Sequence, residues 1–174
     1  MKVEVALVDL TLLAVDAIVN AANTTLLGGA GVDGAIHRAA GPELKAYCVR
    51  LGGCETGEAK ITPGFDLAAK YVVHTPGPIY SEGHAYACDD LLFKSWFNSL
   101  KVADEHGCKS IAFPSISTGA YRFPLDRASQ VARRAILEFK RRPSRNIERI
   151  VVACFDRATY DAYAAAFKGI DAAY

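Results

Sequence analysis

Residues 16–38 place an apolar, β-prone run, a glycine-rich loop and a helix-forming segment in direct succession. The run 16–22 ends just before Asn23, the loop contains three glycines, and Asp33 lies in the first turn expected for the helix. A strand that passes through glycines into a helix directs free backbone N–H groups and the helix dipole at one small volume. This order predicts an anion site that needs no lysine, with two polar side chains beside it.

Strands and helices alternate along the whole chain. Apolar spacing typical of helices recurs in three later segments, and Gly41-Pro42 indicates that one helix ends and another begins. Several of the β-prone runs are continuously apolar, as expected for strands covered on both faces. We therefore predict one α/β domain over residues 1–174, a three-layer α/β/α sandwich with a central mixed sheet. The six expected strands are 3–8, 16–22, 58–62, 71–74, 110–114 and 148–155, and the three helical segments are 92–103, 125–139 and 160–167.

Charge and composition argue against several classes of protein. A net charge of +1 gives no global field for nucleic acid or an anionic membrane. The basic run 140–145 falls where a helix is expected to end, and cations are favourable there without any partner. No apolar run is long enough to span a bilayer, and the N-terminal residues lack the pattern of a signal peptide. Because a β-prone run begins at residue 3, we expect no transit segment. We expect a monomer that binds neither membranes nor nucleic acid.

The five cysteines are an odd number in a domain of core-forming size. This favours reduced thiols and a cytoplasmic location over a disulfide framework. Cys48 and Cys54 match no zinc spacing, so we expect no metal, and nothing else in the sequence indicates a cofactor.

Two glycine-containing loops determine the kind of ligand. Residues 29–34 formally match the GxGxxG dinucleotide motif, but residues 23–28 separate them from the strand, which disfavours a hydride-transferring enzyme. Residues 114–121 repeat the order of strand, small-residue loop and helix. By itself this segment could be an ordinary turn that caps a helix. Together, two such loops at the carboxyl ends of neighbouring strands are suited to clasp a diphosphate.

The motifs in these loops resemble those of a known family. The segments VNAAN (19–23), GGAGVDGAIHRAAG (28–41) and FPSISTGAYRFP (113–124) are similar to the signature loops of macrodomains of the MacroD type. The similarity also includes YVVHT (71–75) and CFD (154–156). The resemblance implies an ADP-ribose-binding protein that hydrolyses ADP-ribose esters, either on proteins or in O-acetyl-ADP-ribose.

The resemblance also implies which residues contact the ligand. Asp9 would accept a hydrogen bond from the adenine amino group beside Leu10, although Asp9 could instead cap a turn before Thr11. Phe155 would pack on adenosine, although a phenylalanine at a strand end is by itself more often a core residue. Val8 replaces a usual glycine, and Ala30 replaces another, which is tolerable if its φ is negative. The diphosphate and distal ribose would be held by Gly28, Gly29, Ala30, Gly31, Val32, Ser115, Ile116, Ser117, Thr118, Gly119, Ala120 and Tyr121.

Asn23, Asp33 and His37 are the candidate catalytic residues. An amide can donate to and accept from ribose hydroxyls, which suits Asn23 to orienting the distal ribose. Asp33 beside a diphosphate is a candidate base, although a ligand phosphate could take the proton instead. His37 lies one helical turn after Asp33 and could orient it or serve a structural role. Asn20 and His74 are expected to make buried structural hydrogen bonds.

Two functions remain open from the sequence. The first is a hydrolase that removes mono-ADP-ribose from acidic side chains of proteins or deacetylates O-acetyl-ADP-ribose. The second is a module that binds ADP-ribose and does no chemistry. Such a binding module needs the adenine and diphosphate contacts but not a positioned base, so the pair Asn23 and Asp33 favours the enzyme.

Overall fold

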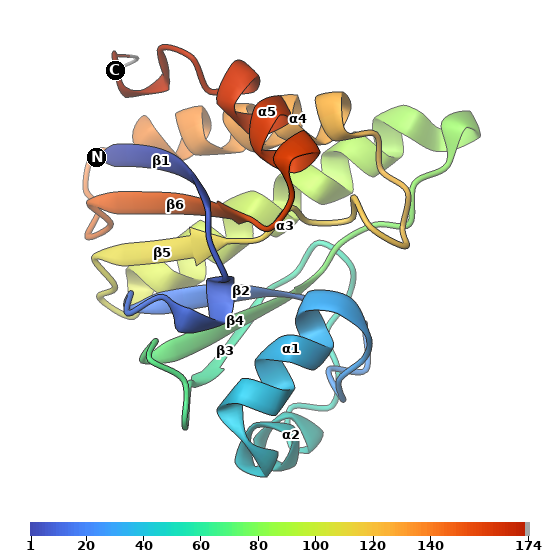
Figure 1. Cartoon of the computed structure of the whole chain (residues 1–174), viewed down its shortest axis with the longest axis vertical. Helices are drawn as coiled ribbons and strands as arrows, with labels where there is room; N and C mark the ends of the chain where they lie inside the picture. Colours follow the sequence, from blue (N-terminus) through green and yellow to red (C-terminus); the bar gives the residue numbers. More distant parts are fainter. Residues whose placement is uncertain (173–174) are drawn as a thin grey trace.

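The computed structural model describes residues 1–172 of the chain (Figure 1). Each of the six predicted strands is present, with ends shifted by at most two residues. The strands are β1 (Lys2–Leu7), β2 (Ala17–Ala22), β3 (Lys60–Pro63), β4 (Tyr71–Pro76), β5 (Ser110–Phe113) and β6 (Arg149–Cys154). The α-helices in these residues are α1 (Gly31–Ala40), α2 (Pro42–Val49), α3 (Ala85–Glu105), α4 (Leu125–Lys140) and α5 (Arg157–Ala166), with short 3₁₀ turns η1 (Leu10–Leu12), η2 (Glu82–His84) and η3 (Ile170–Ala172).

The strands form one sheet in the order β1-β6-β5-β2-β4-β3. All neighbours in it are parallel except β3, which pairs with β4 in the antiparallel direction. The predicted mixed sheet is therefore confirmed. Because β2, β4, β5 and β6 are parallel, the loops that follow them all begin at the same edge of the sheet.

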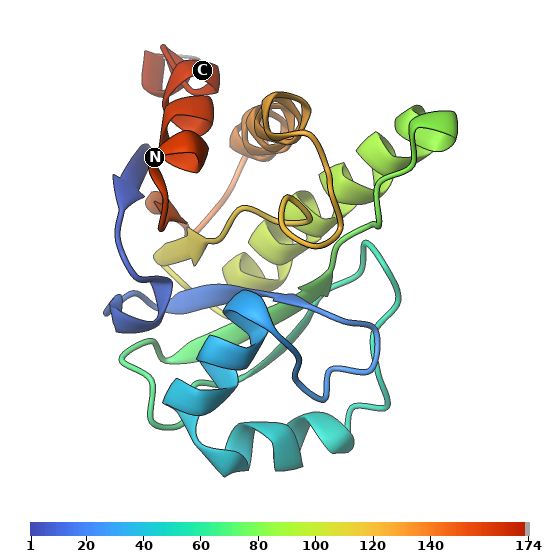
Figure 2. The same ribbon diagram turned by 45° about the vertical axis from the view of Figure 1, so that its right-hand side comes forward.

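The helices form two layers, one on each face of the sheet. Helices α1 and α2 cover one face, and α3, α4 and α5 cover the other (Figures 1 and 2). Successive strand residues alternate between the two cores, as Ile18 and Val19 of β2 do, and both are fully buried. This confirms the three-layer α/β/α sandwich and explains why the strands read as continuously apolar.

Gly41 separates α1 from α2, as the sequence predicted. Its φ of +88° is in the left-handed region, and its N–H bonds the carbonyl of His37 at 3.1 Å. A Cβ there would lie 2.9 Å from Oδ2 of Asp66, so space as well as backbone conformation favours glycine. Pro42 then begins α2, where its fixed φ suits the first helical turn.

The five cysteines are buried, and within residues 1–172 all are free thiols. None of the helices in these residues combines the length and the apolar character needed to cross a membrane.

Candidate functional site

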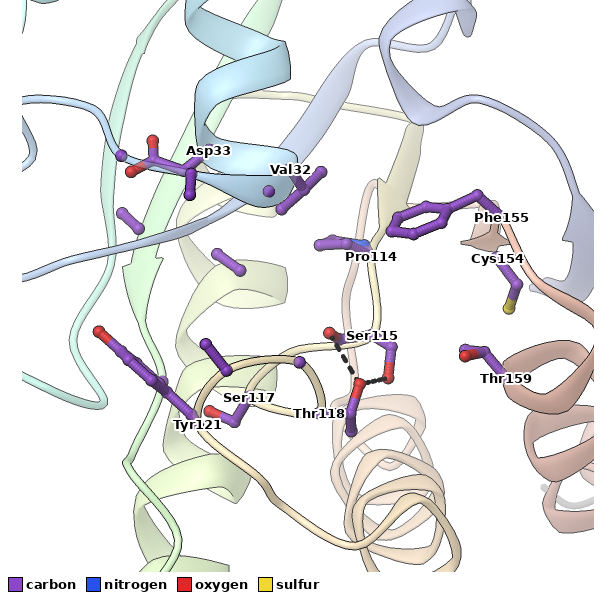
Figure 3. Close-up of a pocket in the computed structure, with 18 of the residues that line it drawn as sticks. Val32, Asp33, Pro114, Ser115, Ser117, Thr118, Tyr121, Cys154, Phe155 and Thr159 are labelled. Carbon is purple, nitrogen blue, oxygen red and sulfur yellow. Dashed lines mark hydrogen bonds between the residues drawn. The ribbon is translucent and has the colours of Figure 1, made fainter.

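A cavity of about 390 Å³ lies at the carboxyl edge of the sheet (Figure 3). The ends of β2, β5 and β6 and the first turns of α1 and α5 contribute to its walls. The structure brings many of the predicted ligand residues together here, namely Asn23, Gly29, Ala30, Gly31, Val32, Asp33, Ser115, Ser117, Thr118, Gly119, Ala120, Tyr121 and Phe155. The cavity walls do not include the predicted residues Asp9, Leu10, Gly28, His37 and Ile116.

Asn23 holds the first glycine loop in place. Its Nδ2 donates to the carbonyl of Gly28 at 2.8 Å, while Oδ1 accepts from the N–H of Leu26 at 3.1 Å and from Oγ1 of Thr25 at 2.7 Å. An amide carries two N–H donors, so one remains for a ligand while the oxygen is engaged in the loop. Asn23 is therefore better placed to donate to a ligand in the cavity than to accept from one.

The first loop leads directly into the N-terminus of α1. Ala30 is the residue before the helix, and its φ of −91° accommodates the methyl group, which answers the question raised by its replacement of a glycine. Gly31 follows with a φ of +60°. The first N–H groups of a helix have no partners within it, and those of α1 begin at the cavity wall.

Asp33 is a buried carboxylate whose side chain reaches the cavity. The residue is 5% exposed, and its Oδ1 accepts a hydrogen bond of 2.8 Å from Nδ2 of Asn20. A Cβ on Gly29 would lie 3.1 Å from Oδ2 of Asp33 and 3.5 Å from Nδ2 of Asn23, so the missing side chain lets both polar groups approach one point.

The surroundings of Asp33 have opposite effects on the pKa of its carboxyl group. Burial raises the pKa of this carboxyl, while the hydrogen bond from Asn20 and the nearby His37 lower the pKa and so limit the rise. A carboxylate with a raised pKa is a better proton acceptor than an ordinary exposed one. Asp33 is therefore a better proton acceptor than an exposed aspartate.

A hydrogen-bonded chain behind Asp33 fixes its orientation. Nδ2 of Asn20 also lies 3.2 Å from Nδ1 of His74, and Nε2 of His74 lies 2.9 Å from Oγ1 of Thr62, which in turn donates to the carbonyl of Pro63. Since an amide nitrogen only donates, Nδ1 of His74 accepts and Nε2 carries the proton. Burial lowers the pKa of His74 to about 3, so the ring is neutral. The buried structural roles predicted for Asn20 and His74 are confirmed.

His37 stands behind the first loop. Its Nε2 lies 3.4 Å from Oδ1 of Asp33, and its ring is 3.6 Å from the position that a Cβ on Gly28 would occupy. The ring centroid is 6.5 Å from that of His74. From this position His37 supports Asp33 and the backbone of Gly28, and a direct contact with substrate would require a change in the loop.

The second loop is built around a residue in an unusual backbone conformation. Ser117 has a φ of +66° and is 7% exposed, and within residues 1–172 its Oγ has no hydrogen-bond partner. A Cβ on Gly77 would overlap Oγ of Ser117 and the side chain of Ile116, so only glycine fits beside this loop. Ile116 itself is fully buried and anchors the loop in the core. A strained residue with an unpaired hydroxyl at a cavity wall is typical of a ligand site.

Phe155 forms the end of the cavity opposite Asp33. It is 76% exposed, which rules out the alternative of a core phenylalanine. Beside it, Asp156 caps α5 by accepting from the N–H of Thr159 at 2.7 Å. Figure 3 shows Phe155 and Thr159 well separated from Asp33 and Tyr121, with Ser115 and Thr118 between the two groups.

Asp9 and Leu10 lie outside the cavity wall. Asp9 accepts from the N–H and the hydroxyl of Thr11, at 2.9 and 2.7 Å, and so takes the capping role that the sequence left open. It follows β1 at the same edge of the sheet as Phe155, because Val8 bonds the carbonyl of Cys154. Leu10 is 4% exposed and belongs to the core under α1 and α2.

Several wall residues were missed by the sequence reasoning. They are Ala21, Ala22, Gly77, Pro114, Ala153, Cys154, Asp156 and Thr159. Gly77 carried a usable signal, because it follows an expected strand within Pro76-Gly77-Pro78, a sequence typical of a turn at a strand end. In residues 1–172, no group of three or more His, Cys, Asp or Glu side chains is arranged to hold a metal ion.

Comparisons with known proteins agree with this geometry. Residues 19–132 match the family model described as Macro domain. A Macro domain-containing protein of Lactiplantibacillus plantarum is 52% identical over 162 residues, which are 93% of this chain and 94% of the relative. The ADP-ribose glycohydrolase MACROD2 of Xenopus laevis is 51% identical over 156 residues, 89% of this chain and 37% of that protein. A variant of the Oceanobacillus iheyensis macrodomain, solved with ADPR, has a TM-score of 0.90 at 36% identity and covers 98% of this chain and 94% of its own.

Proposed function

Because this chain belongs to the macrodomain family, we propose that it is a hydrolase acting on esters of ADP-ribose. Its substrates would be acidic side chains of proteins that carry mono-ADP-ribose, O-acetyl-ADP-ribose, or both. The family relationship supports binding of ADP-ribose, and a relative named as an ADP-ribose glycohydrolase supports the hydrolytic reaction. A module that binds ADP-ribose without chemistry is the alternative.

The cavity suits an extended ligand with adenosine at one end and ribose at the other. Phe155 offers an exposed ring to adenine, and the N-terminus of α1 with the second loop would bind the diphosphate through backbone N–H groups. The distal ribose would then reach Asp33 at the far end (Figure 3), where Asn23 also lines the wall.

The reaction we propose is attack of water on the ester carbonyl carbon. Asp33 accepts a proton from the attacking water as the new C–O bond forms, and the bond from the carbonyl carbon to the ribose oxygen breaks. Asp33 then returns this proton to the leaving ribose oxygen, which gives ADP-ribose and a free carboxylic acid. Asn23 would hold a neighbouring ribose hydroxyl through its remaining N–H donor.

One observation carries this proposal. A buried carboxylate, with its pKa raised and its orientation fixed by Asn20, opens onto the ribose end of the cavity. Burying a charged group is costly unless it serves a purpose, and a module that only binds ADP-ribose has no need for it.

The test combines calorimetric titration of ADP-ribose with turnover of O-acetyl-ADP-ribose and of a glutamate-ADP-ribosylated protein. We expect micromolar binding and turnover by the wild type. Asp33→Ala should lower kcat by about 100-fold or more, with the Kd for ADP-ribose within several-fold. Asp126→Ala is the matched control, because Asp126 lies in the first turn of α4, away from the cavity. Binding without turnover would instead make this chain a reader, and collapse of binding in Asp33→Ala would contradict the role of Asp33.

A further inference from the structure

A second cleft adjoins the cavity at its Asp33 end. Its volume is about 470 Å³, and it shares Asn23, Gly77 and Tyr121 with the first cavity. From there it extends over the loop after β4 and the first turns of α3, as far as Leu91. The three shared residues therefore form the boundary between the cavity and the cleft. In the proposed function the distal ribose lies beside this boundary.

The walls of this cleft are largely apolar, and within residues 1–172 His84 is their one titratable side chain other than Cys88 and Tyr121. Pro78, Ile79 and Leu91 supply apolar surface, and Thr56 and Ser81 supply hydroxyl groups. Among the described residues, no Asp, Glu, Lys or Arg lines the cleft. Such walls suit neutral backbone and apolar side chains and give no favourable site for a phosphate.

Exposed apolar side chains gather at the same place. Ile79 is 70% exposed in the cleft wall, and Tyr86, directly before the wall residue Ala87, is 84% exposed. The guanidinium of Arg127 lies 5.7 Å from the ring of Tyr86 and is itself paired with Asp89, so the ring is held from one side. Exposed apolar groups around a cleft are typical of protein interaction sites.

We propose that this second cleft binds the polypeptide that flanks the ADP-ribosylated side chain. The inference rests on the proposed function, because it takes the distal ribose to lie beside Asn23 and Asp33. A group esterified to that ribose would leave the first cavity past Asn23, Gly77 and Tyr121, and these three residues open into the second cleft. An acetyl group would fill a small part of 470 Å³, whereas a few amino-acid residues would fill it well.

Charge complementarity selects polypeptide over nucleic acid. An ADP-ribosylated oligonucleotide would bring its own phosphates into this space, and nucleic-acid sites provide Lys or Arg for them. The described walls contain no Lys or Arg and offer only the imidazole of His84, while Thr56 and Ser81 can form hydrogen bonds with a peptide backbone.

The experiment measures the affinity of two ligands by calorimetry. One is free ADP-ribose, and the other is ADP-ribose joined through a non-hydrolysable amide to a peptide with apolar residues beside the modified position. We expect the conjugate to bind about tenfold more tightly than ADP-ribose, as a few buried side chains can provide. Ala87→Trp should remove this advantage, because the indole would occupy the cleft, and should leave the Kd for ADP-ribose within about twofold.

The control variant is Ala165→Trp. Ala87 and Ala165 are both exposed alanines in helices, and Ala165 lies in α5 outside both cavities. A second variant, Ile79→Asp, places a charge in the cleft at an exposed site where folding should not suffer, and it should also remove the advantage of the conjugate.

The outcomes separate this inference from the proposed function. Binding of the amide conjugate does not depend on hydrolysis, so absence of turnover would overturn the hydrolase and leave the cleft to be judged by affinity. A conjugate that binds no better than ADP-ribose would overturn the inference. So would an advantage that survives Ala87→Trp and Ile79→Asp, or an ADP-ribosylated oligonucleotide that gains as much as the peptide.

Discussion

The two ends of the main cavity are built in different ways. At one end, Asp33 is 5% exposed and is bonded through Asn20 to the buried ring of His74. At the other, Phe155 is 76% exposed at the end of β6. The first end is fixed by a chain of hydrogen bonds across β2, β4 and β3, whereas the second depends on an exposed ring that the core does not hold.

This difference separates chemistry from binding. A reacting group must be held within a fraction of an ångström of its productive position. The hydrogen bonds from Nδ2 of Asn20 to Asp33 and His74 can provide this. A ring that packs on adenine tolerates small displacements, because stacking is less directional. We therefore expect changes at the buried end to act on kcat and changes at the exposed end to act on Kd.

The largest effect after loss of Asp33 itself is expected from Asn20→Ala. This change removes the bond that orients Asp33 and lowers its pKa, so kcat should fall by about 30-fold, within the usual range for a misplaced general base. The pKa of Asp33 should rise further. Since a base acts when ionised, the acidic limb of the pH–rate profile should move to higher pH.

Ser129→Ala is the control for this prediction. It also removes one hydrogen bond of a buried side chain, that from Ser129 to the carbonyl of Asp126 in α4, remote from the site. An unchanged pH–rate profile in Asn20→Ala, with kcat lowered by the same factor as in Ser129→Ala, would show that Asn20 only stabilises the fold.

A smaller effect is expected on the stability of the buried end in acid. Folded His74 has a pKa of about 3, against 6.5 for an unperturbed histidine. Below pH 6.5 the unfolded state binds a proton that the folded state excludes, so the free energy of unfolding should fall as the pH falls towards 3. One such group contributes about 1.4 kcal/mol per pH unit.

The measurement is the free energy of unfolding, obtained from denaturant titrations of the wild type and of His74→Gln at pH 7, 6 and 5. Asp33 and His37 lie near His74, and the raised pKa of Asp33 acts in the opposite direction, so the difference between wild type and variant isolates the histidine. The variant should lose stability less steeply in acid. Equal slopes in the two proteins would mean that His74 can take up its proton in the folded state.

The sequence predicted the helices and strands better than the side-chain hydrogen bonds that join them. Strand ends and the two loops follow from local signals, namely apolar runs, glycines and Gly41-Pro42. The link from Asn20 to His74 joins residues 54 positions apart and depends on β2 pairing with β4 in one register. Nothing local specifies that register, which is why Asn20 was predicted to make a structural bond but its partners were not named.

The missed residues have the same explanation. Ala153 and Cys154 became wall residues because β6 lies between β1 and β5, and Gly77 because its backbone packs against Ser117. Ile116 is the opposite case. It was predicted to contact the ligand because it lies in the second loop, yet its side chain packs in the core. Which side of a loop faces the ligand depends on backbone angles such as the positive φ of Ser117, and a serine does not indicate such an angle.

The smallest effect is expected at the exposed end. Phe155→Ala removes a ring that is mostly in solvent, so the free energy of unfolding should change by less than about 0.5 kcal/mol. The Kd for ADP-ribose should rise by about fivefold to tenfold, which is the size of one base–aromatic stacking contact, while kcat at saturating substrate stays unchanged. Exposed Leu12, which lines neither cavity, gives the control Leu12→Ala, in which both constants should keep their wild-type values. A fall in kcat for Phe155→Ala as large as that for Asn20→Ala would contradict the separation of the two ends, because it would show that adenine stacking is used to position the ribose for reaction.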